Sequence, residues 1–355
     1  MSARARAVVD TAALDHNLRR VRELAPTSRV FAAVKADGYG HGSVAVATAL
    51  AADGFAVASL DEALRLRLAG ITEPIITLSQ PLDAAVLAEA SAQNIQPVAY
   101  GPCQVEALAQ YSGTPLAAWL KIDSGMHRLG VAADEAGALA DRLATAPGVE
   151  DLGFLTHLAC ADDPGDPMSD RQLTCFSDAV GQRAGQRSIA NSAAVLTRPS
   201  AHADVVRPGI MLYGSSPLND HSAAELGLRG VMQLTAPIIN RHRVAAGEPI
   251  GYGAQFVAER DTEIAVVGIG YGDGYPRHAP SGTPVMVGGH RCPLAGRVSM
   301  DMITVDVTDA PTAEIGDVAT LWGPDLPADE IATAAGTIAY ELFCRLTPRV
   351  EFGAI

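Results

Sequence analysis

From residue 29 to residue 209, short apolar runs alternate with amphipathic stretches of helical periodicity. Most of the runs are continuously apolar, which is typical of parallel strands covered by helices. They are Arg29–Lys35, Gly54–Ser59, Pro74–Ser79, Ile95–Tyr100, Leu116–Asp123, Gly153–Leu158, Arg187–Asn191 and Asp204–Gly209. One helix is well delimited, with Ser59 and Glu62 as a candidate capping box and Gly70 at its C-terminal end. The pattern predicts an α/β fold with an N-terminal (β/α)8 barrel of the TIM type, although a doubly wound sheet would look similar.

After about residue 230 the pattern changes to short β-rich pieces separated by Gly, Pro and Asp. The candidate strands here are Thr262–Gly270, Thr283–Val287 and Met302–Val307, and helical periodicity is scarce until Asp329–Ala335. This predicts a second, mainly β domain. We therefore expect a barrel over residues 1–230 and a C-terminal β domain over 231–355, with which the extreme N-terminal segment can pack.

Composition narrows the class of protein. Hydrophobic residues make up 48% of the chain, enough for a sizeable core, and the formal net charge of −14 disfavours a nucleic-acid partner. The longest apolar stretch, Val44–Ala52, is far shorter than the ~20 residues that span a bilayer. The five cysteines show no spacing typical of disulfides or of a zinc site. We expect a cytoplasmic protein without membrane, nucleic-acid or metal partners.

Polar residues end every candidate barrel strand, which is where barrel enzymes carry their chemistry. They are Lys35, Ser59, Ser79, Tyr100, Lys121, His157, Asn191 and Arg207. Lys35 is the most informative, because a lysine at the end of a buried strand is costly unless its amine has a role or a partner. The glycine-rich turn after it allows close approach to a ligand, and Tyr39 adds a hydroxyl. A desolvated lysine is a Schiff-base nucleophile toward an aldehyde; a lysine extending to solvent at the barrel rim is the alternative.

The turns after the last two candidate strands suit a phosphate group. Ser192 can cap a helix and donate its hydroxyl, while Gly209 and Ile210 can offer backbone N–H groups. An ordinary N-cap is the alternative for Ser192. A lysine suited to an aldehyde and a phosphate site on one barrel together favour pyridoxal 5'-phosphate (PLP) as the cofactor.

Eight ordered segments resemble sequence blocks of the alanine racemase family. They are Val34–Gly42, Lys121–Gly130, Thr156–Asp162, Asn191–Ala194, Arg207–Gly214, Gly268–Arg277, Gly296–Asp301 and Ala339–Arg345. The resemblance extends from Val8 to the C-terminus. It departs at Thr11, where an apolar residue is expected, and at Ser188, where some relatives have a histidine behind the arginine that contacts the pyridine ring.

The resemblance implies a homodimeric, PLP-dependent enzyme that interconverts L- and D-alanine by a two-base mechanism and supplies D-alanine for peptidoglycan. It implies that Lys35 carries the cofactor and serves the D-face of the substrate. Tyr271 would serve the L-face with the help of His157. Arg207 would face the pyridine nitrogen as a cation, which disfavours protonation there and limits transamination.

The remaining site residues also follow from the resemblance. Arg128 would contact the cofactor's phenolic oxygen and the substrate carboxylate, and Lys121 would be carbamylated so that it orients Arg128. Met300 and Asp301 would complete the substrate pocket from the β domain. The phosphate would be held by Tyr39, Ser192, Gly209, Ile210 and Tyr340. The active sites would be shared between the two subunits of the dimer.

Three other interpretations are weighed against this one. A PLP-binding homeostasis protein would resemble the barrel half only. A decarboxylase of the same fold would carry a catalytic cysteine near an acidic residue and a phosphate loop with three glycines, and neither is evident. A racemase for serine or other amino acids differs by a few residues of the pocket wall and is the hardest to separate from an alanine racemase.

Overall fold

The computed structural model describes residues 4–354, and these form two compact units. Residues 15–212 and 216–221 form the first, here called the barrel unit. The second, called the β unit, contains the described residues up to 14 together with 213–215 and those from 222 onward. Within residues 4–354, no helix has the length and apolar character needed to cross a membrane.

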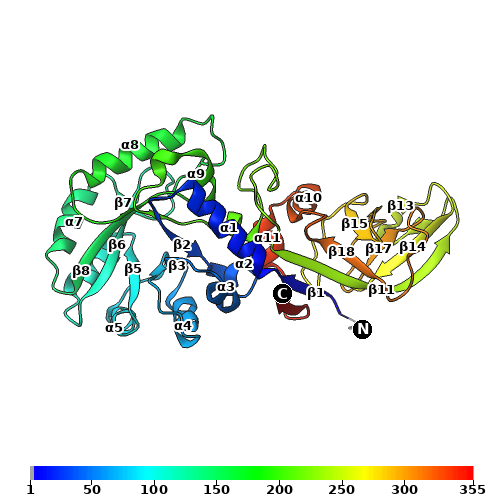
Figure 1. The fold of residues 1–355 in the computed structure, drawn as a ribbon, viewed down its shortest axis with the longest axis horizontal. Helices are drawn as coiled ribbons and strands as arrows, with labels where there is room; N and C mark the ends of the chain where they lie inside the picture. The colour runs from blue at the N-terminus through cyan, green and yellow to red at the C-terminus, as the bar shows by residue number, and fades with distance from the viewer. Residues whose placement is uncertain (1–3, 355) are drawn as a thin grey trace. The chain divides into compact units, whose positions relative to one another are not determined.

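Parallel strands close into a ring in the barrel unit (Figure 1). They are β2 (Arg29–Ala33), β3 (Gly54–Val57), β4 (Ile75–Thr77), β5 (Ile95–Ala99), β6 (Leu116–Asp123), β8 (Val149–Leu155), β9 (Arg187–Ser188) and β10 (Val205–Val206). The ring closes because β10 pairs with β2, and β5 pairs with β6. The predicted (β/α)8 barrel is therefore confirmed and the doubly wound alternative is wrong. A short strand, β7 (Val131–Ala132), also pairs with β6.

Helices follow the strands and cover the outside of the ring (Figure 1). They are α2 (Lys35–Tyr39), α3 (Ser43–Ala49), α4 (Leu60–Leu68), α5 (Ala84–Ala92), α6 (Pro102–Gln110), α7 (Ala136–Ala144), α8 (Met168–Val180) and α9 (Ser192–Thr197), with α1 (Thr11–Leu24) before β2. A cluster of buried apolar side chains packs together from six different strands: Phe31, Ile76, Val98, Trp119, Leu155 and Val205. These residues fill the interior, as side chains do in a barrel of this size.

The ends of several strands and the capping of one helix differ from the local predictions. Strand β8 begins at Val149, whereas the predicted strand began at Gly153. The prediction omitted the first part of the strand because Glu150 and Asp151, which are exposed, interrupt the apolar run. The capping box on α4 is only half formed: Ser59 Oγ accepts from the N–H of Glu62 at 3.4 Å, but the Glu62 carboxylate binds other backbone groups. Gly70 ends this helix with φ 89°, as predicted.

The β unit contains a sheet with the strand order β16-β15-β18-β11-β1-β19, and β14 and β17 extend it from β11. The strands are β1 (Arg6–Val9), β11 (Met232–Val244), β14 (Thr262–Val267), β15 (Pro284–Val287), β16 (His290–Pro293), β17 (Ile303–Asp306), β18 (Val318–Trp322) and β19 (Glu351–Ala354). A separate pair, β12 (Pro249–Ile250) and β13 (Phe256–Val257), and two helices, α10 (Ala328–Ala334) and α11 (Ala339–Cys344), complete it. The mainly β character predicted for the C-terminal part is confirmed.

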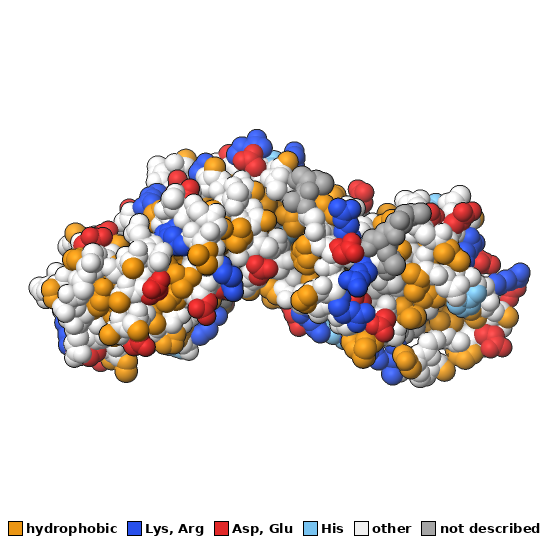
Figure 2. Space-filling model, turned by 90° about the horizontal axis from the view of Figure 1, so that it is seen from below, with side chains coloured by type: hydrophobic (Ala, Val, Ile, Leu, Met, Phe, Trp, Pro, Cys, Tyr) orange, Lys and Arg blue, Asp and Glu red, His pale blue; other side chains and the backbone are white. Residues whose placement is uncertain are grey.

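The surface mixes both signs of charge. On the face in Figure 2, acidic and basic side chains are interspersed among apolar ones. Ion pairs such as Arg260–Asp309, at 2.6 Å, are solvent-exposed. Pairs of this kind contribute little to stability, about 0–1 kcal/mol each.

Candidate active site at the carboxyl end of the barrel

Three of the predicted site residues lie on or just beyond barrel strands: Lys121 on β6, His157 after β8 and Arg207 after β10. Side chains two residues apart on a strand share one face of the sheet. Each of the three follows a residue of the buried core at that spacing: Lys121 follows Trp119, His157 follows Leu155 and Arg207 follows Val205. The pKa values of Lys121 and His157 both respond to the charges of Arg207, Arg128 and Lys35, so these five side chains form one electrostatic site.

Lys121 is buried in a positively charged environment. Burial is the main factor that lowers the pKa of its amine to about 8, and the positive charges of Arg207, Arg128 and Lys35 lower it further. The carboxylate of Asp123 acts in the opposite direction. At pH 7 about a tenth of this amine is therefore neutral and nucleophilic, far more than for an ordinary lysine.

His157 responds to the same environment. Burial lowers the pKa of its imidazole to about 3, and the positive charges of Arg207 and Lys121 add to the effect. The ring is consequently neutral throughout the physiological pH range, so it can both donate and accept a hydrogen bond.

Arg207 is a buried cation held by neutral groups. Its guanidinium donates to the hydroxyl of Ser188, to the carbonyl of Thr156 at 2.6 Å and to the carbonyl of Ile189 at 3.4 Å. Burial lowers its pKa to about 10, which still leaves it protonated at neutral pH. Ser188 can accept this bond because its own proton goes to the carbonyl of Val205, at 2.8 Å. The serine thus supplies a neutral acceptor behind Arg207.

The turn that follows Lys35 is left-handed. Five consecutive residues, Ala36–Gly40, have φ between 52° and 75°. Three of them are not glycine, and each such residue costs about 1–3 kcal/mol, so the surroundings must enforce the conformation. Asp37 Oδ1 accepts from the backbone N–H of Ser43 at 2.9 Å and from its hydroxyl at 3.1 Å. The N–H of Ala36 is held by Glu62 at 2.8 Å.

Tyr39, Ser192 and Gly209 come together at the end of the barrel. Ser192 Oγ accepts from the N–H of Gly209 at 2.8 Å and from the N–H of Met211 at 3.4 Å. A Cβ at position 209 would lie 2.4 Å from the Tyr39 hydroxyl, so a larger residue there would displace the Tyr39 ring. Ile210 follows directly and begins a 3-10 turn, Ile210–Tyr213.

Ser192 does not cap helix α9, contrary to one of the interpretations above. The N-cap is Asn191, whose side-chain oxygen accepts from the N–H of Ala194 at 3.0 Å. In its two bonds to the N–H groups of Gly209 and Met211, the Ser192 hydroxyl acts as an acceptor, and these bonds do not use its own proton.

A tight loop after β6 carries Arg128 at an exposed position. Asp123 Oδ1 accepts from the N–H groups of Gly125 and His127, both at 3.0 Å, which fixes the first half of the loop. Gly130 closes the second half with φ 138°, and a Cβ there would lie 2.4 Å from the nitrogen of Asp123. The loop is therefore held in one shape on both sides of Arg128.

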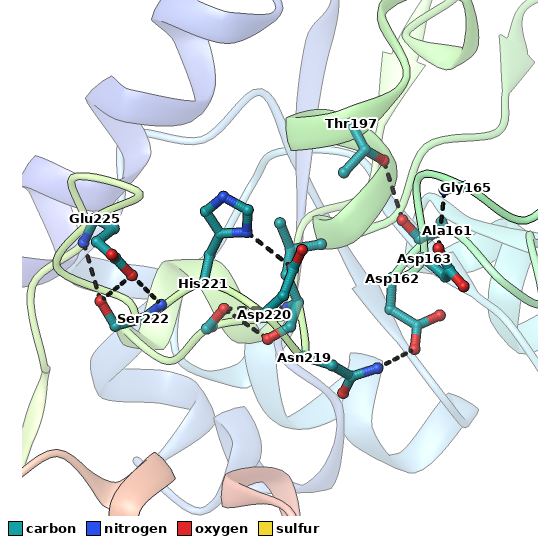
Figure 3. Close-up of polar contacts among 12 residues, drawn as sticks. Ala161, Asp162, Asp163, Gly165, Thr197, Asn219, Asp220, His221, Ser222 and Glu225 are labelled. Atoms are coloured by element: carbon teal, nitrogen blue, oxygen red, sulfur yellow. Dashed lines mark hydrogen bonds and ion pairs between the residues drawn. The ribbon is translucent and has the colours of Figure 1, made fainter.

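The loop after His157 is also tied down (Figure 3). Thr197 on α9 donates its hydroxyl to the carbonyl of Ala161 at 3.0 Å, and the amide of Asn219 donates to Asp162 at 3.2 Å. Both contacts restrain the chain that leads away from the barrel mouth.

In the β unit, backbone contacts gather Tyr271 with the segment that carries Met300 and Asp301. The N–H of Tyr271 donates to the carbonyl of Ser299 at 3.0 Å, and the next N–H donates to that of Met300 at 2.8 Å. Arg349 pairs with Asp301 at 2.7 Å. Tyr271 and Met300 are both exposed, whereas Tyr340 is half-buried on α11.

Comparison with known proteins agrees with both halves of the structure. The family of alanine racemase N-terminal domains matches residues 9–217, and that of the C-terminal domains matches residues 231–353. The alanine racemase of Thioalkalivibrio sulfidiphilus is 53% identical over 352 residues, which cover 98% of each chain. The chain belongs to the alanine racemase family. The family resemblance predicted from the sequence is confirmed.

Relatives within the alanine racemase family include solved structures. The biosynthetic alanine racemase of Pseudomonas aeruginosa is 50% identical over 347 residues, 97% of each chain. A crystal structure of biosynthetic alanine racemase from Pseudomonas aeruginosa, at 48% identity, superposes with a TM-score of 0.96 over 100% of both chains. The alanine racemase of Acinetobacter baumannii gives a TM-score of 0.93 at 37% identity, again over 100% of both chains. Because matches of this kind include both domains, a homeostasis protein built from the barrel alone is excluded.

Two features escaped the predictions from the sequence. Gln172 is fully buried on α8; its amide oxygen accepts from the N–H of Ala159 at 2.8 Å and its nitrogen donates to the carbonyl of His157 at 3.1 Å. Its spacing from the buried residue Phe176 could have placed it on the inner face of the helix. The second feature is the scarcity of lysine: Lys35 and Lys121 are the only lysines among the 26 Lys and Arg residues of the chain.

Proposed function

We propose that this chain is a PLP-dependent alanine racemase that interconverts L- and D-alanine by a two-base mechanism and supplies D-alanine for peptidoglycan. One observation carries the proposal. The only two lysines of the chain both belong to the electrostatic site at the barrel mouth, together with a buried arginine held by neutral groups. Membership of the alanine racemase family supports the same conclusion.

The residues at the barrel mouth fit PLP. The hydroxyls of Tyr39 and Ser192 and the backbone at Gly209 and Ile210 would hold the phosphate. The N–H of Gly209 donates to Ser192 Oγ at 2.8 Å, and a Cβ at position 209 would lie 2.4 Å from the Tyr39 hydroxyl, so these three residues are close together. Tyr340 would complete this set. When bound, PLP would supply an electron-withdrawing group that makes the α-proton of an amino acid acidic.

Two residues would move the α-proton, one on each face of the substrate. Lys35 Nζ would take or return the proton on the D-face, and Tyr271 Oη would do so on the L-face. Tyr271 needs help to give up its phenol proton. The neutral imidazole of His157 is suited to give it, because it can accept a hydrogen bond from the phenol.

Arg207 would govern the choice of reaction. It would stand at the pyridine nitrogen of the cofactor, and a permanent cation there disfavours protonation of that nitrogen. Its partners Ser188, Thr156 and Ile189 are neutral, so its positive charge is not cancelled by them. Limited charge flow into the ring restrains transamination and favours return of the proton to the α-carbon.

Arg128, Met300 and Asp301 would bind the substrate, with Arg128 on its carboxylate. Lys121 would be carbamylated: its neutral amine attacks CO2, a C–N bond forms and the amine loses one proton to water. The resulting anion would orient Arg128. The pKa of about 8 at Lys121 supports this step, because it leaves about half of the amine neutral at pH 8.

The functional protein would be a cytoplasmic homodimer. Residues 1–230 would form the PLP-binding barrel and 231–355 the β domain, with the N-terminal segment packed with the latter. Tyr271 of the partner subunit would complete each site, which is the arrangement that the family resemblance implies. Serine or another small amino acid as the preferred substrate is the alternative.

Turnover and cofactor linkage test the proposal. Purified full-length protein with PLP should racemise L- and D-alanine, and faster than any other member of a panel that includes serine and lysine. After borohydride reduction and proteolysis, the cofactor should be found on Lys35, and Lys35→Ala should lose it. Because the chain has only one other lysine, label on Lys121 would refute the assignment of Lys35 directly. Preferential turnover of serine would establish the alternative.

A further inference from the structure

The carboxylate of Glu62 joins the ends of two neighbouring barrel strands. Oε1 accepts from the N–H of Ala36 at 2.8 Å, just beyond β2, and Oε2 accepts from the N–H of Ala58 at 2.6 Å, just beyond β3. Glu62 itself lies in the first turn of α4. One side chain therefore ties the ends of both strands to the start of a helix.

The bond to Ala36 acts on the residue that precedes it. The N–H of Ala36 belongs to the peptide that leaves Lys35, and a peptide is planar, so holding this N–H fixes the plane through which Lys35 is connected. Ala36 also begins the left-handed turn, with φ 52°, a conformation that alanine seldom adopts unaided. The later part of the turn is held by the bonds between Asp37 and Ser43. Glu62 holds the part next to the lysine.

We propose that Glu62 is a positioning residue for Lys35: by fixing the Lys35–Ala36 peptide, it directs the lysine amine to the aldehyde of the cofactor. The inference rests on the proposed function of Lys35. This role differs from that of an ordinary capping residue. The Glu62 carboxylate does not return to the N–H of Ser59 but binds the N–H of Ala36, beyond the neighbouring strand β2.

The chain offers graded variants and two matched controls. Glu62→Gln keeps one acceptor oxygen and turns an NH2 group toward the other backbone N–H, whereas Glu62→Ala removes both acceptors. Asp61→Asn removes one negative charge from the same helical turn at an exposed position. Asp83→Ala removes the N-cap of α5, where Asp83 accepts from the N–H of Val86 at 2.8 Å, and so destabilises the barrel at a distance from Lys35.

The experiment measures how fast folded apo-protein captures PLP. Full-length protein freed of cofactor is mixed with excess PLP, the linkage is followed by absorbance, and reduced cofactor is mapped to Lys35. Circular dichroism and Tm report folding in parallel. We expect Glu62→Gln to slow capture about tenfold, in line with the loss of one charge-assisted hydrogen bond, and Glu62→Ala to slow it more. Asp61→Asn and Asp83→Ala should capture PLP at the wild-type rate, although Asp83→Ala lowers Tm.

Three outcomes would overturn the inference. Folded Glu62→Gln and Glu62→Ala could capture PLP as fast as wild type, which excludes a positioning role. Asp83→Ala could slow capture as much as Glu62→Gln, which would make the effect one of general stability. Wild-type protein could fail to link PLP to Lys35; this result refutes the proposed function itself and is recognisable because it appears before any variant is compared.

Discussion

Replacing Lys121 by glutamine tests whether carbamylation of this lysine offsets the positive charges at the barrel mouth. In its protonated form this buried amine lies in the field of Arg207, Arg128 and Lys35, with Asp123 as the opposing charge. Carbamylation would replace a cation by an anion at that point. Glutamine is neutral, has a similar length and cannot be carbamylated, so Lys121→Gln removes the predicted modification and little else.

The neutral fraction of the Lys121 amine follows from its pKa, which is about 8 instead of the ordinary 10.5. At pH 8 about half of the amine is neutral, compared with about 0.3% for an ordinary lysine, a gain of roughly 150-fold in the species that attacks CO2. The lowered pKa also means that the charged form is unfavourable in the folded protein, by about 3 kcal/mol. For the unmodified amine, stability is lowest below pH 8 and rises as the pH increases toward 10.5, because the unfolded chain holds its proton over that range.

The assay is 13C NMR of the protein under 13C-labelled CO2 at a fixed pressure, repeated between pH 6 and pH 9. With only two lysines in the chain, and Lys35 blocked by reduction of its linkage to PLP, a carbamate signal can come only from Lys121 or the N-terminal amine. We expect wild type to show a carbamate signal in addition to that of the N-terminal amine, growing with pH around the pKa of about 8, and we expect Lys121→Gln to lose this additional signal. In the unreduced enzymes, Lys121→Gln should also raise KM for alanine about tenfold, because Arg128 loses an oriented charge partner.

Identical carbamate signals in wild type and Lys121→Gln would assign the modification to another amine. Absence of any signal in wild type at pH 8 would refute the reasoning, since half of the amine should then be neutral. A signal that titrates near pH 10.5 would show that the environment of Lys121 does not lower its pKa.

Three further predictions follow from the proposed mechanism. Tyr271→Phe should suppress α-proton exchange in deuterated water from L-alanine more than from D-alanine, and equal loss in both directions would argue against two bases. Arg207→Glu should increase pyruvate formation relative to racemisation, with Arg207→Gln as the neutral control and Tm as the check on folding; no increase in pyruvate would remove Arg207 from this role. Lys35→Ala and Tyr271→Phe chains that are unfolded and refolded together should regain roughly a quarter of wild-type activity, because half of the randomly paired dimers contain one intact site. Heterodimers that form without any activity would place both residues in one chain.

The barrel strands could be predicted because buried parallel strands are recorded in the sequence as apolar runs. Several strands of the β unit were not predicted, and the longest of them, β11 (Met232–Val244), has a different pattern. Its first part alternates between buried and exposed residues, and its second part contains the polar run Asn240–Arg243. A long strand with both faces changing in polarity leaves no single period to detect. Tertiary pairing with β14 and β18, which the sequence does not reveal, defines it instead.

The sequence was sufficient to name the residues of the site but not to predict their backbone conformations and hydrogen bonds. Lys121, His157 and Arg207 each follow a buried core residue at the spacing of strand alternation. The left-handed turn after Lys35 was signalled only by its glycines, since nothing in the residues Ala36 and Asp37 indicates positive φ. The reach of Glu62 was also hidden, because a capping box is a local rule and the bond to Ala36 crosses to a neighbouring strand.

Lysine and arginine have different roles in this chain. Lysine occurs where an amine must lose its proton, and arginine occurs where a side chain must stay charged. Burial acts on both types at the barrel mouth: the pKa of Lys121 falls to about 8 and that of Arg207 to about 10. At pH 8 the same kind of environment thus makes about half of the lysine neutral and leaves about 99% of the arginine charged. Everywhere else the chain uses arginine, so its two lysines stand where an amine can act as a nucleophile or a base. Neither the Lys35→Arg nor the Lys121→Arg variant should therefore retain wild-type function, although both substitutions keep the positive charge.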